Sequence, residues 1–197
     1  MTGTDKPESR PARARGANGR FTAAIPAAAP ASDAAPRPLE LYLLRHADAG
    51  DSSLWTGVDA ERPLSKKGRR QAKALARTLK GLGLQVDAVI TSPLLRAAQT
   101  AKPVAKALAV ETLTDERLGY DFGRKELAAL VSQLGTGMER VVLVGHDPGF
   151  TEVASFLTGA PIAMAKGALA RIDLAEREVR AGSGDLRWLL PPDAVVR

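Results

Sequence analysis

Two histidines and two arginines stand where apolar segments give way to polar ones. Arg45 and His46 follow an apolar run in "LYLLRHADAG", Arg96 lies in "SPLLR", and His146 follows "RVVLVG". A guanidinium presents a planar fork of N–H donors that matches the oxygens of a phosphoryl group. A neutral imidazole can attack phosphorus through its unprotonated nitrogen. These residue types therefore predict chemistry on a phosphoryl group.

The amino-acid composition excludes several other kinds of functional site. The 197-residue chain holds no cysteine and only two histidines, so thiolate catalysis, disulfides and the common zinc clusters are excluded. Any metal would need mostly carboxylate ligands, and we expect neither a metal nor a cofactor. No apolar segment approaches the length of a membrane span, and no secretory signal is evident, which predicts a cytoplasmic protein.

The first 38 residues differ from the rest of the chain. Residues 1–38 consist mainly of Ala, Pro, Arg, Gly and Ser, and they carry +3 of the net charge of +6. Such a segment offers too little apolar surface to offset the entropy lost on ordering. We therefore predict a disordered tail over 1–38 and one globular domain over 39–197. Scattered arginines in a tail do not by themselves indicate a nucleic-acid partner, and none is expected.

Beyond the tail, short apolar runs alternate with helical periodicity. This alternation predicts an α/β fold, with a single, mostly parallel sheet covered by helices on both faces. The expected strands are 39–44, 86–92, 140–145, 168–174 and 186–191, and the expected helices are 64–84, 93–110, 125–134 and 148–159. Pro103 predicts a kink or break in the second of these helices.

The residues of interest follow three of the expected strands. Arg45 and His46 end the first, Ser92-Pro93 and then Arg96 follow the second, and His146-Asp147-Pro148 follow the third. Ligands bind open α/β sheets at the carboxyl ends of the strands, where the N-termini of helices also favour anions. The arginines and histidines are therefore expected to meet at one anion-binding crevice. Ser92 and Asp147 are expected to cap the helices that follow them.

The same segments resemble a known family. "RHA" (45–47), "RPLSKKGRRQAKALA" (62–76), "SPLLRAAQTA" (92–101) and "VGHDPG" (144–149) resemble signatures of the histidine phosphatase superfamily, the phosphoglycerate-mutase-like proteins. "KGALARIDL" (166–174) and "LRWLLPP" (186–192) resemble the ending of its small SixA-type members, the phosphohistidine phosphatases. The resemblance covers about residues 39–192 and implies a phosphoglycerate-mutase-like fold.

The resemblance also implies roles. His46 would be the nucleophile that becomes phosphorylated, Arg45 and Arg96 would hold the phosphoryl oxygens, and His146 would donate to them, without a metal. For the general acid we choose Glu116. Other carboxyl groups remain open for that role, namely Asp48, Asp51, Asp115 and Asp121.

Substrate size is a separate inference. Only 49 residues (146 − 96 − 1) separate Arg96 from His146, which leaves little room for the lids of larger relatives. An open site would suit phosphohistidine on a protein surface, such as that of a histidine-containing phosphotransfer domain. The resemblance thus implies a phosphohistidine phosphatase, with a broad-specificity phosphomonoesterase for small phosphoesters as the alternative. A noncatalytic phosphoprotein-binding module is the alternative from another class.

Overall fold

The structure is a computed structural model that describes residues 38–135 and 137–195. The tail expected over 1–38 therefore lies, apart from Pro38, outside the described residues, and its disorder stays a prediction. The first strand begins at Leu39, where the sequence changes from Ala- and Pro-rich to apolar.

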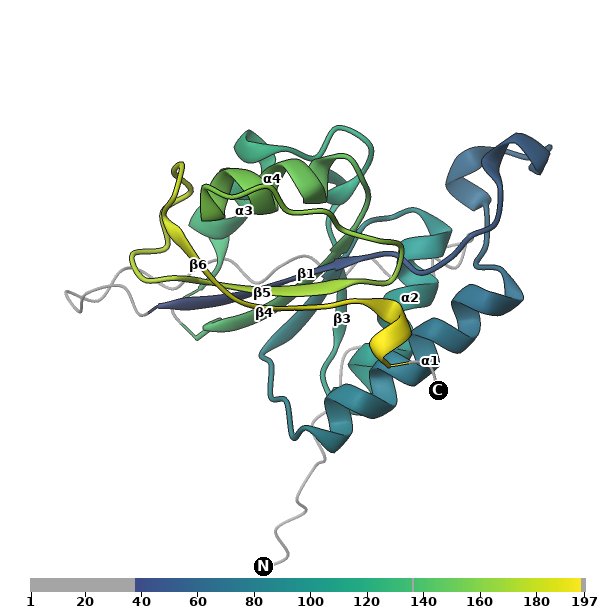
Figure 1. Cartoon of the computed structure of the whole chain (residues 1–197), viewed down its shortest axis with the longest axis horizontal. Coiled ribbons are helices and arrows are strands. Elements are labelled where there is room, and N and C mark those ends of the chain that lie inside the picture. Colours follow the sequence, from purple (N-terminus) through teal and green to yellow (C-terminus); the bar gives the residue numbers. More distant parts are fainter. Residues whose placement is uncertain (1–37, 136, 196–197) are drawn as a thin grey trace, which may run out of the picture.

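One six-stranded sheet runs through the molecule in the order β3-β2-β4-β1-β5-β6 (Figure 1). The four strands from β3 to β1 are parallel, whereas β5 and β6 pair antiparallel. The strands are β1 (Leu39–Arg45), β2 (Ala88–Thr91), β3 (Thr112–Thr114), β4 (Arg140–Gly145), β5 (Leu169–Leu174) and β6 (Gly184–Leu190). The predicted mostly parallel sheet is thus confirmed, and its two closing strands run antiparallel.

Helices cover both faces of the sheet, as predicted. In Figure 1, α1 and α2 lie on one face, while α3 and α4 lie on the other. The helices are α1 (Lys66–Gly81), α2 (Leu95–Leu108), α3 (Arg124–Gln133) and α4 (Gly149–Thr158), with 3-10 turns η1 (Ser52–Leu54), η2 (Asp59–Glu61), η3 (Glu116–Leu118) and η4 (Pro192–Ala194). None of the helices in the described part of the chain is long and apolar enough to cross a membrane.

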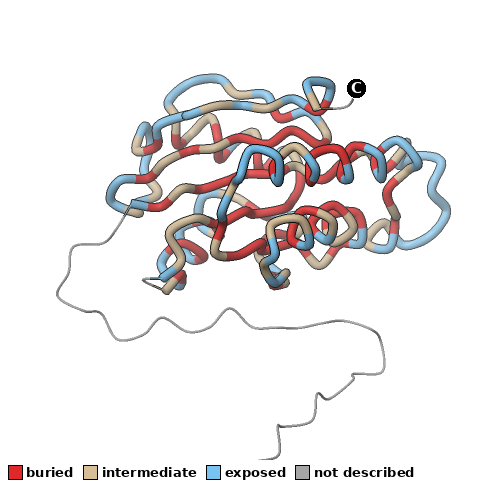
Figure 2. The backbone as a smooth tube through the Cα atoms, turned by 90° about the horizontal axis from the view of Figure 1, so that it is seen from below, coloured by how far each residue is buried: buried red, intermediate tan, exposed pale blue. Residues whose placement is uncertain are grey.

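The first strand shows why the core has two halves. Leu41 and Leu43 belong to the apolar cluster shared with α3 and α4, whereas Tyr42 and Leu44 belong to the cluster under α1 and α2. Successive side chains of a strand point to opposite faces, so a strand covered on both sides must be apolar throughout. Figure 2 shows the buried stretches of the backbone gathered toward the interior of the molecule, with the exposed stretches at its outside.

Two local predictions differ from the structure. The strand β3 was missed because its three residues, "TLT", give no period, and pairing with β2 defines it. Of the kink or break expected at Pro103, the break was wrong, since α2 continues through Pro103 from Leu95 to Leu108. Thr100, Ala101, Val104 and Ala105 are buried on either side of Pro103, and packing of this face keeps the helix continuous.

Candidate active site

The two histidines lie side by side at the carboxyl ends of β1 and β4. These strands are parallel neighbours, with Arg45 paired to Gly145, so the next residue of each strand is His46 or His146. The His46 amide donates to the Gly145 carbonyl at 2.9 Å. The ring centroids are 5.1 Å apart, with the planes tilted by 52°. The sheet register therefore places both imidazoles in one site.

His46 carries its proton on Nδ1, which leaves the other ring nitrogen, Nε2, unprotonated. Its Nδ1 lies 2.7 Å from the carbonyl oxygen of Ala47, and because a carbonyl only accepts, Nδ1 carries the hydrogen. Burial lowers the pKa of His46 to about 4, and the charges of Arg96 and Arg45 act in the same direction. At neutral pH the ring is uncharged and Nε2 keeps its lone pair.

His146 is held from the β2 side. Its Nε2 lies 2.8 Å from the hydroxyl oxygen of Ser92, and this oxygen accepts a hydrogen bond from the Leu94 amide at 3.2 Å. Burial is the largest cause that lowers the pKa of His146 to about 3, and the charges of His46 and Arg96 act in the same direction. The expected capping role of Ser92 was wrong, because α2 begins only at Leu95 with Leu94 as its N-cap. The serine instead orients an imidazole.

Asp147 only partly fulfils its expected capping role. Its Oδ1 accepts from the amide of Thr151 at 3.3 Å and from the Thr151 hydroxyl at 2.8 Å, although Pro148 is the N-cap residue of α4. Its Oδ2 lies 3.2 Å from Nη1 of Arg45. The carboxylate therefore joins the start of α4 to one arginine of the site.

Both guanidiniums are fixed by oxygen atoms. Nη1 of Arg45 donates to the carbonyl of Met164 at 2.6 Å. Arg96, which is 4% exposed, donates through Nη1 to the carbonyl of Asp59 at 2.9 Å and pairs through Nη2 with its Oδ2 at 3.1 Å. Backbone and carboxylate oxygens thus set the orientation of each fork before any ligand arrives.

Three donors or acceptors in this cluster have no partner. Within the described residues, the buried side-chain nitrogen and oxygen atoms that lack a hydrogen bond are Nε of Arg45, Nε of Arg96 and Nδ1 of His146. Burying an unpaired polar group costs about 1–3 kcal/mol, so such atoms are rare in native proteins. Their concentration around the two imidazoles indicates a place where a ligand supplies the missing hydrogen-bonding partners.

Comparison with known proteins places this arrangement in a family. The sequence model of the histidine phosphatase superfamily (branch 1) matches residues 41–132. An uncharacterized protein of Picosynechococcus is 31% identical over 169 residues, which cover 78% of this chain and all of that protein. The phosphohistidine phosphatase SixA of Escherichia coli is 29% identical over 161 residues, 78% of this chain and 94% of SixA.

Solved structures agree with the sequence matches. The protein histidine phosphatase SixA complexed with tungstate superposes with a TM-score of 0.65 at 26% identity, over 79% of this chain and 98% of that one. A phosphohistidine phosphatase SixA structure from Nakamurella gives the same TM-score at 25% identity, over 79% and 96% of the two chains. The chain belongs to the histidine phosphatase superfamily. Its fold is of the SixA type.

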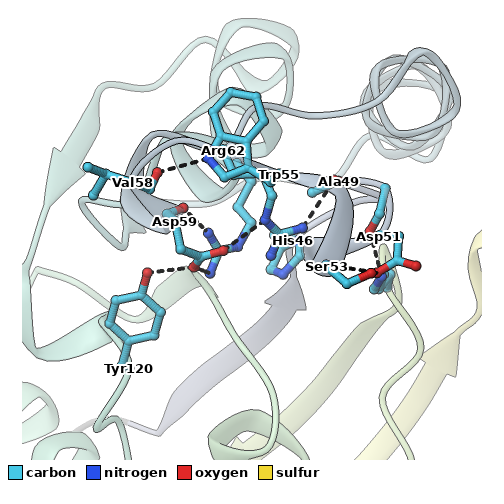
Figure 3. A network of polar contacts seen from close by, with 12 residues as sticks. His46, Ala49, Asp51, Ser53, Trp55, Val58, Asp59, Arg62 and Tyr120 are labelled. Atoms are coloured by element: carbon cyan, nitrogen blue, oxygen red, sulfur yellow. Dashed lines mark hydrogen bonds and ion pairs between the residues drawn. The ribbon is translucent and has the colours of Figure 1, made fainter.

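In this member of the superfamily, a network next to Arg96 includes residues that sequence reasoning missed. Asp59 lies in the segment between β1 and α1, residues 46–65, which we call the arm. Its carboxylate accepts from Nε of Arg62 at 2.8 Å and from the hydroxyl of Tyr120 at 2.6 Å (Figure 3). The Tyr120 hydrogen bond is the main reason why the pKa of Asp59 is lowered to about 2, and Arg62 and Arg96 add to it. Asp59 is therefore ionised at neutral pH.

A sequence signal existed for only part of this network. Arg62 is the first residue of the quoted segment 62–76 and Asp59 lies three residues before it, a spacing that allows an ion pair within one turn. Tyr120 gave no such signal, because it reaches the site from 61 residues further along the chain through the loop after η3.

The superfamily's general acid, assigned here to Glu116, is not identified by the structure. Glu116 is exposed on η3, a turn whose Leu118 carbonyl lies beside Gly145 at the end of β4. Asp115 next to it is buried and ion-paired with Arg117. Of the other candidates, Asp48 receives the hydroxyl hydrogen bond of Ser65, and Asp51 and Asp121 are exposed. The role of Glu116 stays a prediction.

Two further contacts support the loop that follows His46. The amide of Ala47 donates to the hydroxyl of Thr100 at 3.0 Å, and this hydroxyl donates to the Arg96 carbonyl at 2.7 Å. Gly68 in α1 lies against the backbone of Asp48, and an added Cβ would fall 1.9 Å from the Asp48 carbonyl oxygen. Both contacts fix the loop relative to α1 and α2. Among the described residues, no group of three His, Cys, Asp or Glu is placed to hold a metal ion.

Proposed function

We propose that this protein is a phosphatase that uses His46 as its nucleophile and dephosphorylates phosphohistidine on a protein. The observation that carries the proposal is the set of unpartnered nitrogens on Arg45, Arg96 and His146 around a neutral His46. A phosphoryl group supplies oxygen acceptors for such nitrogens, and the similar SixA structure is a complex with tungstate, another tetrahedral oxyanion.

The first chemical step transfers the phosphoryl group between two imidazoles. Nε2 of His46 attacks phosphorus and forms a new P–N bond, while the P–N bond to the substrate ring breaks. The substrate ring leaves with that electron pair, and because it carries a proton on its other nitrogen, it departs as neutral imidazole. His46 enters in the matching state, with its proton on Nδ1 facing Ala47. No separate acid is required.

The second step releases phosphate. A water oxygen attacks phosphorus, the bond to Nε2 of His46 breaks, and the electron pair returns to the ring, which again becomes neutral. The water proton leaves with phosphate or solvent. Arg45 and Arg96 hold the oxygens in both steps, and His146 donates to the oxygen on which charge builds. A preorganised donor of this kind contributes about 3 kcal/mol to stabilising the transition state.

The leaving group of phosphohistidine differs from that of an alkyl phosphoester in its need for a proton. An alkoxide leaving group needs a proton from a general acid whose pKa lies near the working pH. Asp59 contacts Arg96, and its pKa of about 2 keeps it ionised, so it has no proton to give. Phosphohistidine avoids this difficulty because its leaving ring brings its own proton. The expected cytoplasmic location and the histidine-containing phosphotransfer partner stay predictions.

Transfer of a phosphoryl group to His46, followed by release of phosphate, is the reaction that tests the proposal. The protein is mixed with a phosphotransfer domain carrying radiolabelled phosphohistidine, and free phosphate and label on the chain are followed over time. We expect phosphate release by the wild type and neither release nor labelling with His46→Ala. In His146→Ala the label should still form on His46 but more slowly, which makes this variant the matched histidine control.

Other outcomes decide between the alternatives. Stoichiometric binding without phosphate release would contradict the enzyme and favour a binding module. Small phosphoesters hydrolysed as fast as phosphohistidine would contradict the protein substrate and favour a broad-specificity phosphomonoesterase.

A further inference from the structure

Tyr120 is an exposed aromatic ring held in a defined position beside the site. It is 58% exposed, yet its ring lies 6.2 Å from that of His146 with an angle of only 23° between the planes. The guanidinium carbon of Arg96 lies 5.8 Å from the Tyr120 ring centroid, and the hydroxyl is bonded to Asp59. One part of the ring is thus anchored to site residues while much of it remains open to solvent.

Asp59 retains capacity for one more donor. Its Oδ2 accepts from Tyr120 and pairs with Arg96, whereas its Oδ1 accepts from Nε of Arg62. Two carboxylate oxygens together offer about four lone-pair directions, so these contacts leave about one unused. The side chain is 42% exposed, and an incoming N–H group has access to it.

The geometry of phosphoryl transfer relates this pair of residues to the nucleophile. Attacking and leaving atoms lie roughly in line on opposite sides of phosphorus. Figure 3 shows His46 and Tyr120 on opposite sides of Asp59, whose carboxylate pairs with the phosphate-holding Arg96. A leaving group on the Arg96 and His146 side of phosphorus would lie beside Asp59 and Tyr120, since Asp59 pairs with Arg96 and the Tyr120 ring lies 6.2 Å from that of His146.

We propose that Tyr120 and Asp59 form the subsite for the leaving group, with Tyr120 stacking on a planar ring and Asp59 accepting its N–H. This inference rests on the proposed function, and it adds which residues select the leaving group. The ligand chemistry is a planar phosphoramidate whose second ring nitrogen carries a proton.

The subsite would mirror the environment of the nucleophile. The Nδ1–H of His46 donates to the Ala47 carbonyl, and the corresponding N–H of the leaving ring donates to the Asp59 carboxylate. As the P–N bond breaks, its electron pair moves to the leaving nitrogen and the ring changes from cation to neutral imidazole. A carboxylate stabilises the cationic ring when it binds, and stacking on Tyr120 orients it for departure.

Three small substrates separate the contribution of stacking on Tyr120 from that of the hydrogen bond to Asp59. Phosphoimidazole has a planar leaving ring that carries an N–H group in its protonated, cationic form. Phenyl phosphate has a planar ring without an N–H group, and phosphoramidate has a P–N bond without a ring. The value of kcat/KM is measured for each with the wild type, Tyr120→Leu, Tyr120→Phe and Asp59→Asn. Ratios between substrates cancel any general loss caused by movement of Arg96.

The expected ratios differ between the variants. Tyr120→Leu should lower the preference for phosphoimidazole over phosphoramidate about fivefold, and Tyr120→Phe should retain it, because the ring remains. Asp59→Asn should lower the preference for phosphoimidazole over phenyl phosphate about tenfold. Trp55→Leu is the matched control, since this exposed aromatic of the same arm donates to Val58 within its own loop, and its ratios should not change.

The failures of the two proposals can be told apart. If the wild type releases phosphate from these substrates but Tyr120→Leu and Asp59→Asn lower all rates equally, the leaving-group subsite is overturned and the phosphatase proposal stands. If the wild type releases phosphate from a phosphorylated phosphotransfer domain but from none of the three small substrates, the subsite is overturned and the phosphatase proposal stands. If it releases phosphate from neither, both proposals are overturned.

Discussion

His46 and His146 face each other with ring centroids 5.1 Å apart because they occupy equivalent positions after two adjacent parallel strands. Their charge states are therefore coupled, since protonation of either ring places a cation beside the other. Both rings are neutral at pH 7, which suits one of them to attack and leaves the fixed positive charge to Arg45 and Arg96. This arrangement has consequences for stability as well as for catalysis.

Acid should destabilise the fold through these rings. The pKa of His46 falls from 6.5 to about 4 on folding, so below pH 6.5 the unfolded chain binds a proton that the folded chain does not. Stability present above pH 6.5 is lost as the pH falls toward 4, by about 2 kcal/mol between pH 7 and 5 for this ring. His146 acts in the same direction, because its folded pKa is about 3.

Urea unfolding of the wild type and His46→Asn at pH 7 and 5 measures this loss. The free energy of unfolding should fall by about 2 kcal/mol less in the variant, because asparagine does not titrate. An equal fall in both proteins would show that His46 is not held neutral by folding.

Replacing Arg96 by lysine should weaken oxyanion binding. A lysine has a single ammonium nitrogen instead of the three nitrogens of a guanidinium. It cannot contact the Asp59 carbonyl oxygen and Asp59 Oδ2 and still present a further nitrogen to a ligand, as Nε of Arg96 can. Titration calorimetry with tungstate should show affinity reduced by about 10–100-fold in Arg96→Lys. Arg77→Lys, at an exposed position of α1, is the control and should bind as the wild type does. Equal affinities in all three proteins would remove Arg96 from the binding site.

Adding a methyl group at Gly68 should destabilise the protein. Its Cβ would fall 1.9 Å from the Asp48 carbonyl oxygen, so α1 must move away from the loop that follows His46. Gly68→Ala should lower the free energy of unfolding by about 1–3 kcal/mol and reduce turnover, since the Ala47 carbonyl belongs to the same loop. Both effects can be measured by urea unfolding and phosphate release.

Gly81→Ala on the same helix is the matched control for Gly68. Nothing lies within 4 Å of a Cβ at Gly81, and alanine there should stabilise the helix by up to about 1 kcal/mol. A Gly68→Ala protein as stable as Gly81→Ala would show that the contact between Gly68 and Asp48 does not constrain the loop.

Much of the sheet could be predicted because local pattern and burial agree there. The strand β4 spans the predicted residues, Arg140–Gly145, and encloses the apolar run 141–144, since buried parallel strands are continuously apolar. The strand β3 could not be predicted in this way, because three residues at the edge of a sheet are defined by their partner β2. Pro103 likewise has a strong local preference that packing of α2 against the sheet overrides.

The candidate site likewise contains residues that could be identified from the sequence and contacts that could not. His46, Arg45, Arg96 and His146 could be found from sequence because strand ends in a parallel sheet converge at one edge. Ser92 was noticed as a helix cap, but its hydroxyl bonds His146, a contact across 54 residues. No local pattern distinguishes a serine that caps from one that orients a ring, since both require only a hydroxyl after a strand.

The amino-acid sequence by itself determined the alternation of strands and helices and the residue types gathered at the sheet edge, since both follow from periodicity and from the side-chain order of parallel strands. Only the tertiary structure decided that the Asp59 carboxylate pairs with Arg96 and with Tyr120. Such contacts depend on how loops from distant segments fold over one another, and loop conformation is set by those contacts rather than by any repeating pattern along the chain.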